Sequence, residues 1–129
     1  MRAEILRGDA ASEFDTAERC HIIEVANDAN DPNLSIARAR VEPGITTAWH
    51  CLRAIEERYL IISGSGLVEV GDLDPVAVGV GDVVRIPPDT RQRISNTGSE
   101  DLLFYALCTP RFEQAAYVDL EASDQTTRP

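Results

Sequence analysis

Short apolar segments separated by turn residues divide most of this chain and leave little room for helices. Val, Ile and Leu dominate several of these segments, and Gly, Pro, Asn or Asp bounds them. Such residues favour strands, and turn signals at short intervals are typical of an all-β sandwich or barrel. The segments are His21 to Val25, Leu34 to Val41, Glu57 to Ile62, Gly66 to Val70, Pro75 to Val78, Asp82 to Ile86, Gln92 to Asn96 and Leu102 to Cys108. The sequence therefore predicts an all-β fold.

The length and composition fit one globular domain. Of the 129 residues, 43% are hydrophobic and 26% are charged, which is ordinary for a domain with a single core. We expect one domain over residues 1–129, with a barrel core at about 34–110, an N-terminal strand or edge segment at 1–33 and a C-terminal tail at 111–129. From Ser12 to Cys20 two interpretations stand, a turn of helix begun by a weak cap or an irregular segment.

Charge and cysteine content exclude several classes of function. The formal net charge of −10 repels phosphate backbones, so we expect no nucleic-acid partner. All twelve basic residues are arginine, and the absence of lysine rules out Schiff-base chemistry. No apolar run is long enough for a signal peptide or a membrane span, so we expect a cytoplasmic protein with no membrane partner. The three cysteines form no Cys-x-x-Cys pair and are expected to be free thiols.

Alternation along the predicted strands indicates which side chains enter the barrel. In the second segment Arg38 and Arg40 alternate with small residues, and we expect these arginines to face solvent. The alternative is that Arg40 lines a cavity. Cys108 is expected to be a small buried hydrophobe, with a place in a cavity wall as the alternative. Cys51 is out of phase with its inward-facing neighbours and should point away from the interior.

Two blocks in the middle of the chain place chemically distinctive residues at fixed intervals. The first block, GITTAWHCLRAIEERYLIISGSG, contains Gly44, His50, Glu57 and Gly64. The second block, GDVVRIPPDTRQRISN, contains Gly81, Pro87 and Asn96. Only glycine adopts positive φ freely, so the three glycines indicate sharp turns at strand ends.

The two blocks resemble, in order, the two sequence motifs of the cupin family. The first block departs from its motif at Leu52, where the family has a second histidine. In the second block Asp89 replaces the motif glycine, and Gln92 replaces the last histidine. The resemblance implies a single antiparallel double-stranded β-helix, a jelly-roll barrel of about six to eight strands with a ligand cavity between its sheets. It also implies a homodimer paired through strands near the N-terminus.

The resemblance further implies a metal site, which this chain keeps only in part. Of the four ligand positions, His50, Glu57 and Gln92 retain donor atoms, whereas Leu52 has none. An amide oxygen coordinates hard cations, so this set would hold one divalent ion, Mn, Ni, Fe or Zn, weakly. We expect Glu57 to approach His50 from the next strand and Gln92 to come from across the barrel.

The same residues permit chemistry that needs no metal. His50 beside Glu57 in a cavity of low dielectric is a competent acid–base pair for an isomerisation or epimerisation. Tyr59 shares a strand face with Glu57 and is either a hydroxyl donor in the site or a core aromatic. Phe112 and Tyr117 either close over the cavity mouth or pack on the outside of the barrel.

Two functions from different classes follow from these patterns. The first is a small-molecule-binding cupin with a partly degraded divalent-metal site, a metal-dependent isomerase or oxygenase acting on a sugar or small organic acid. The alternative is a non-catalytic, metal-free cupin that binds or senses a ligand. The barrel fold does not choose between them, because it carries many activities.

Overall fold

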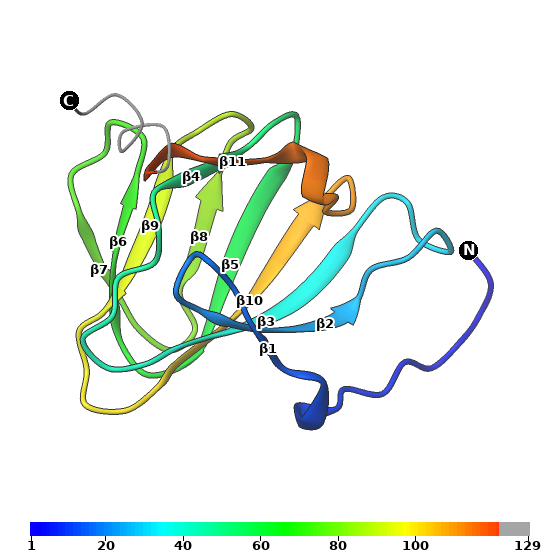
Figure 1. Ribbon diagram of the computed structural model, residues 1–129, viewed down its shortest axis with the longest axis horizontal. Coiled ribbons are helices and arrows are strands. Elements are labelled where there is room, and N and C mark those ends of the chain that lie inside the picture. The colour runs from blue at the N-terminus through cyan, green and yellow to red at the C-terminus, as the bar shows by residue number, and fades with distance from the viewer. Residues whose placement is uncertain (122–129) are drawn as a thin grey trace.

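The computed structural model describes residues 1–121, which form two antiparallel β-sheets packed face to face (Figure 1). The six-stranded sheet contains, in spatial order, β1 (Phe14–Asp15), β2 (His21–Ala26), β3 (Ser35–Val41), β10 (Leu102–Thr109), β5 (Glu56–Ser63) and β8 (Val83–Ile86). The five-stranded sheet contains β11 (Tyr117–Asp119), β4 (His50–Leu52), β9 (Gln92–Asn96), β6 (Gly66–Val70) and β7 (Val76–Val78). Two 3₁₀ turns, η1 (Ala10–Ser12) and η2 (Gln114–Ala116), precede β1 and β11. The predicted all-β, antiparallel fold is confirmed.

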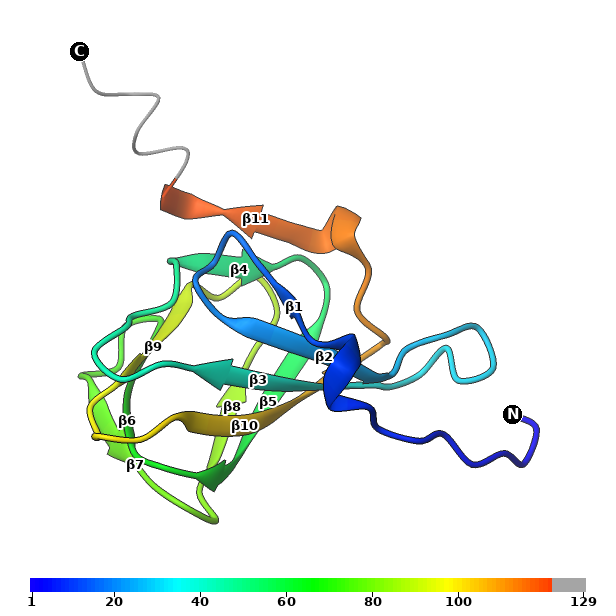
Figure 2. The ribbon, with the colours of Figure 1, turned by 60° about the horizontal axis from the view of Figure 1, so that its bottom comes forward.

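All eight predicted strands are present, but three further strands raise the number in residues 1–121 above the expected six to eight. The additional strands β1, β4 and β11 have two or three residues each, which is shorter than the runs of about four or more residues that indicate a strand in a sequence. The helical turn considered between Ser12 and Cys20 is wrong, because β1 forms there after η1 has ended. Part of the expected tail is also a strand, since β11 pairs with β4 across one end of the barrel (Figure 2). Residues 122–129 of that tail lie outside the described residues.

The inward-facing side chains of β3 and β10 change in size along the barrel. The two strands pair over their whole length, from Leu102 opposite Val41 to Cys108 opposite Ser35. From one end to the other, the side chains that face inward are Val41, Ala39, Ala37 and Ser35 on β3 and Leu102, Phe104, Ala106 and Cys108 on β10. Val41 and Leu102 belong to the main apolar core, which fills one end of the barrel. The small residues at the opposite end leave space between the sheets.

Several turns between the strands have a left-handed backbone conformation, which explains the glycines of the two motifs. Gly44, Gly64 and Gly81 have φ of 78°, 87° and 90°, so the three predicted sharp turns are confirmed. At Gly64 a Cβ atom would also lie 2.8 Å from the carbonyl oxygen of Asp101. Asp89, which replaces the motif glycine, adopts a φ of 61° and accepts a hydrogen bond from the Ala54 amide at 3.3 Å. This side-chain contact holds the left-handed turn against the end of β4.

The arginines of β3 lie on the outer face of the six-stranded sheet, as expected. Arg40 pairs with Glu13 at 2.6 Å and with Asp101 at 3.2 Å, and Arg38 donates to Glu13 at 3.4 Å. Arg40 therefore does not line the cavity. Within residues 1–121 no helix has the length and apolar character that crossing a membrane requires.

Candidate functional site

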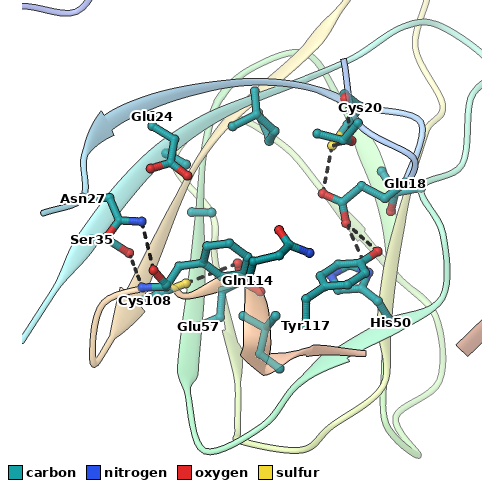
Figure 3. Close-up of a pocket in the computed structure, with 18 of the residues that line it drawn as sticks. Glu18, Cys20, Glu24, Asn27, Ser35, His50, Glu57, Cys108, Gln114 and Tyr117 are labelled. Atoms are coloured by element: carbon teal, nitrogen blue, oxygen red, sulfur yellow. Dashed lines mark hydrogen bonds and ion pairs between the residues drawn. The ribbon is translucent and has the colours of Figure 1, made fainter. Parts of the chain in front are cut away.

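A cavity of about 350 Å³ opens at the end of the barrel where the inward-facing side chains are small (Figure 3). Strands β2, β3, β5 and β10 supply one wall, and β4, β11 and the turn before β2 supply the other. Ala37 lies opposite Ala106, and Ser35 lies opposite Cys108, so two neighbouring strands contribute no bulky side chain there. This volume suits a small organic ligand.

His50 is buried in the cavity wall, with 5% of its surface exposed. Alternation on β4 turns His50 and Leu52 inward and Cys51 outward, as predicted. The Nδ1 atom of His50 lies 2.7 Å from the carbonyl oxygen of Ala48. A carbonyl oxygen can only accept, so Nδ1 carries a proton, and a neutral imidazole offers its Nε2 lone pair as an acceptor. The ring of Tyr117 stacks on the imidazole, with 5.1 Å between ring centroids.

Glu57 lies on the facing sheet with 8% of its surface exposed. Its Oε2 atom accepts a hydrogen bond from the Cys108 thiol at 3.6 Å, whereas its Oε1 atom has no hydrogen-bond partner among the described residues. The pKa of this carboxyl is raised to about 7, chiefly by burial; His50 opposes the shift, and the nearby Glu18 contributes to it. The group therefore exchanges a proton near neutral pH.

Tyr59 and Gln92 form a buried pair beside Glu57. The Tyr59 hydroxyl donates to Gln92 Oε1 at 2.5 Å, and the Tyr59 ring packs on Phe104 with 4.4 Å between ring centroids. Tyr59 and Glu57 share the inward face of β5, as predicted, and both line the cavity. Burial raises the pKa of Tyr59 well above its usual value of 10.0. Tyr59 is thus both a core aromatic and a cavity residue, with its hydroxyl engaged by Gln92.

Glu18, in the turn between β1 and β2, is a site residue that the sequence did not reveal. Its carboxylate accepts from the Cys20 thiol at 3.1 Å and from the Tyr117 hydroxyl at 3.4 Å, and it lies 3.5 Å from His50 Nδ1. The backbone of the turn is fixed by a hydrogen bond from the Ala48 amide to the Glu18 carbonyl at 3.0 Å. No periodicity marks this residue, because only long-range contacts bring the turn over the cavity.

The structure corrects the expected position of Gln92, which does not come from across the barrel, whereas Glu57 lies on β5, the next strand along the chain. Gln92 lies directly opposite His50 on the neighbouring strand β9, and Glu57 comes from the facing sheet. The reason is that the chain crosses between sheets after Leu52, so residues close in sequence end on opposite walls. The sequence led us to expect that His50 pairs with Glu57. Among the described residues, His50 instead contacts the Ala48 carbonyl and the Glu18 carboxylate.

The structure shows the positions of several residues for which the sequence left two alternatives. Cys108 is buried among apolar residues, as expected, and it also lines the cavity, which was the alternative. Phe112 and Tyr117, for which the mouth and the barrel exterior were both left open, also line the cavity. The three cysteines are free thiols, as predicted.

A family model supports the motif resemblance. Residues 37–108, more than half of the chain, match the model described as "Cupin domain". The chain belongs to the cupin family. A relative, the uncharacterized protein MJ1618 of Methanocaldococcus jannaschii, is 35% identical over 78 residues, which are 60% of this chain and 62% of that protein. The match thus spans less than two thirds of the relative's length.

Solved structures share the cupin barrel at low sequence identity. Pac13 of Streptomyces, described as a unique nucleoside dehydratase, has a TM-score of 0.74 at 16% identity, covering 91% of this chain and 92% of its own. A predicted oxalate decarboxylase of Thermotoga maritima has a TM-score of 0.73 at 20% identity, covering 83% of this chain and 99% of its own. Identities this low show the fold alone, and they confirm the jelly-roll, double-stranded β-helix.

The cupin metal site is poorly matched by the side chains at its four positions. Leu52 presents an apolar side chain to the cavity where the family has a ligand. The Oε1 atom of Gln92 already accepts the Tyr59 hydroxyl, which competes with a cation for that oxygen. Within residues 1–121 no group of three or more His, Cys, Asp or Glu side chains is arranged to hold an ion. His50 and Glu57 alone do not make the family's donor set.

Proposed function

We propose that this cupin binds a small molecule in its cavity and transfers protons to and from it through Glu57 and His50. The observation that carries the proposal is the buried Glu57 carboxyl in the cavity wall, whose Oε1 atom has no hydrogen-bond partner within residues 1–121. A buried polar atom without a partner is costly, and a ligand that hydrogen-bonds to it removes that cost.

The two groups suit acid and base roles on opposite walls of the cavity. With a pKa of about 7, Glu57 is able either to donate or to accept a proton at neutral pH. His50 offers Nε2 as a base, and the imidazolium formed when it takes a proton is stabilised by Glu18, 3.5 Å from Nδ1. One group takes a proton from the ligand while the other returns one, as isomerisation and dehydration require.

The similar structures are consistent with such a reaction class. Pac13 is described as a nucleoside dehydratase, and removal of water from a hydroxyl-bearing ligand requires a base and an acid. Both Pac13 and the predicted oxalate decarboxylase are named as enzymes, which favours catalysis over sensing. We therefore infer an isomerase or dehydratase acting on a small hydroxyl-bearing molecule, with ligand sensing as the alternative.

Solvent-proton exchange tests the proposal without knowledge of the substrate. Sugars, nucleosides and small hydroxy acids are incubated with the protein in D₂O, and deuterium incorporation or loss of water is followed by mass spectrometry and NMR. The Glu57→Gln variant should lower the rate by roughly 100-fold or more, the usual contribution of a general acid or base. Glu56→Gln is the matched control, because the Glu56 side chain is 60% exposed and lies outside the cavity.

Equal rates for wild type and Glu57→Gln would contradict the proton-transfer role. Ligand binding in both proteins, with turnover in neither, would favour the sensing alternative. Weak binding of a divalent ion by His50, Glu57 and Gln92 stays a prediction, which elemental analysis of protein never exposed to chelator tests. Near-stoichiometric metal that disappears in His50→Ala would establish such a site.

The homodimer and the cytoplasmic location also stay predictions from the sequence. Support for self-association comes from β1, which lies at the edge of the six-stranded sheet and exposes 47% of Phe14. Edge strands with exposed apolar side chains favour pairing with another chain. Light scattering of the purified protein measures its mass directly.

A further inference from the structure

The charged side chains of the cavity wall are almost all acidic. Among the described residues that line the cavity, the carboxylates are Glu18, Glu24 and Glu57, and His50 is the one basic group. None of the described arginines lines it. An anionic ligand therefore finds no guanidinium to pair with, although the chain contains twelve arginines.

Among the described residues, the side chains of two of these carboxylates have oxygen atoms without a protein partner, one buried and one exposed. Glu18 already faces His50 and accepts hydrogen bonds from Cys20 and Tyr117. Glu57 is more than nine-tenths buried, and its Oε1 atom has no partner among the described residues. Glu24 lies opposite Ala37, on the cavity side of β2, and its side chain forms no hydrogen bond or ion pair within residues 1–121 (Figure 3).

Aromatic rings complete an environment that favours positive charge. Phe14, Phe104, Phe112 and Tyr117 line the same cavity as the carboxylates. The face of an aromatic ring attracts a cation, and the attraction grows when the cation is removed from water. Carboxylates and aromatic faces together therefore favour an ammonium or guanidinium group over a carboxylate.

We propose that the cavity selects a cationic small molecule, whose amine or guanidine group binds against Glu57 and is attracted through the mouth by Glu24. A small organic acid, one of the ligand classes expected from the sequence, would bring a further negative charge among these carboxylates. The inference rests on the proposed function in that the same cavity is the ligand site, but it does not depend on the proton-transfer step.

Three probes of similar shape, one cationic, one neutral and one anionic, test this selection. n-Butylammonium, n-butanol and butyrate are titrated at millimolar concentration into the ¹⁵N-labelled protein at neutral pH, and amide shifts around the cavity are followed by NMR. Butylammonium should bind roughly tenfold more tightly than butanol, and butyrate more weakly than both, because a charge pair in a partly buried site is poorly screened. Equal binding of the three probes, or no binding of butylammonium, would overturn the proposal.

The Glu24→Gln variant locates the source of the preference. Glu24 is exposed at the mouth, so its substitution leaves the core intact. The variant should bind butylammonium several-fold more weakly and butanol unchanged, whereas Glu56→Gln should match the wild type. Unchanged butylammonium binding in Glu24→Gln would remove Glu24 from the proposal and overturn it as stated.

The two proposals fail in different experiments. Probe binding is measured without turnover, so loss of the charge preference leaves the exchange results with Glu57→Gln untouched. Conversely, exchange that does not depend on Glu57 contradicts proton transfer and leaves a measured preference for cations intact.

Discussion

Asn96 and Glu57 are both buried polar side chains, but they lie at opposite ends of the barrel. At the packed end, the Asn96 amide donates to the carbonyls of Val41 and Glu100, both at 2.8 Å, and its oxygen accepts from the Gly98 amide at 2.9 Å. At the cavity end, one oxygen of Glu57 accepts a hydrogen bond from a thiol, and the other has no partner in the part of the chain that the structure describes. The barrel thus satisfies a buried polar group where it serves the fold and leaves one unsatisfied where a ligand can complete it.

The two ends of the barrel also differ in how densely their side chains are packed. Val41 and Leu102 are each 0% exposed in the main core, where side chains from both sheets fill the space. Six residues along the same two strands, Ser35 and Cys108 border the cavity instead. Stability should therefore depend on the packed end, and ligand binding should depend on the cavity end.

The largest expected effect is from truncation at the packed end. Leu102→Ala should lower the free energy of unfolding by about 2–5 kcal/mol, because it leaves a cavity in a close-packed core. The control is Leu73→Ala, since Leu73 is 68% exposed, and its effect should be at most about 0.5 kcal/mol. Urea unfolding compares the two variants, and equal midpoints would contradict the assignment of stability to this end.

The next effect is a pH dependence that comes from Glu57. Its pKa is about 7 in the folded protein and 4.5 when solvated, so the folded state binds the proton more tightly. The free energy of unfolding should therefore fall as pH rises from 4.5 to about 7, by roughly 3 kcal/mol from this group alone. Glu57→Gln should lack this contribution, whereas Glu56→Gln should keep it. Parallel pH profiles for wild type and Glu57→Gln in urea unfolding would show that Glu57 does not titrate in this range.

Local sequence patterns were sufficient to predict the packed end. Runs of β-branched residues and the glycines at 44, 64 and 81 determine strands and turns through interactions within a few residues. His50 and Glu57 were identified as site residues because the motif intervals point to them. Such patterns contain no information on which strands become neighbours, so Gln92 was expected across the barrel from His50, whereas it lies opposite His50 on the adjacent strand β9.

The parts of the site that escaped prediction depend on contacts distant in sequence. Glu18 reaches the cavity because its turn is bonded to Ala48 and because Arg19 pairs with Glu121, 102 residues away. Tyr117 stacks on His50 only because β11 pairs with β4. A short segment has no local signal for such placement, since the free energy that fixes it comes from the rest of the barrel.

The smallest expected effect on stability is from filling the cavity. Ala37→Leu adds apolar volume opposite Ala106, where the interior has space, so the free energy of unfolding should change by less than about 1.5 kcal/mol. Two residues along the same strand, Ala39 is 2% exposed and belongs to the main core, and Ala39→Leu should cost about 1–3 kcal/mol through overpacking.

Ligand binding should be much more sensitive than stability to the Ala37→Leu substitution. Ala37→Leu should abolish the amide shifts that butylammonium causes, because the added side chain occupies the volume that the ligand needs. An Ala37→Leu variant that unfolds like the wild type and still binds the probe would place the ligand elsewhere. Loss of binding with stability preserved would show that the small residues of β3 and β10 serve ligand binding rather than the fold.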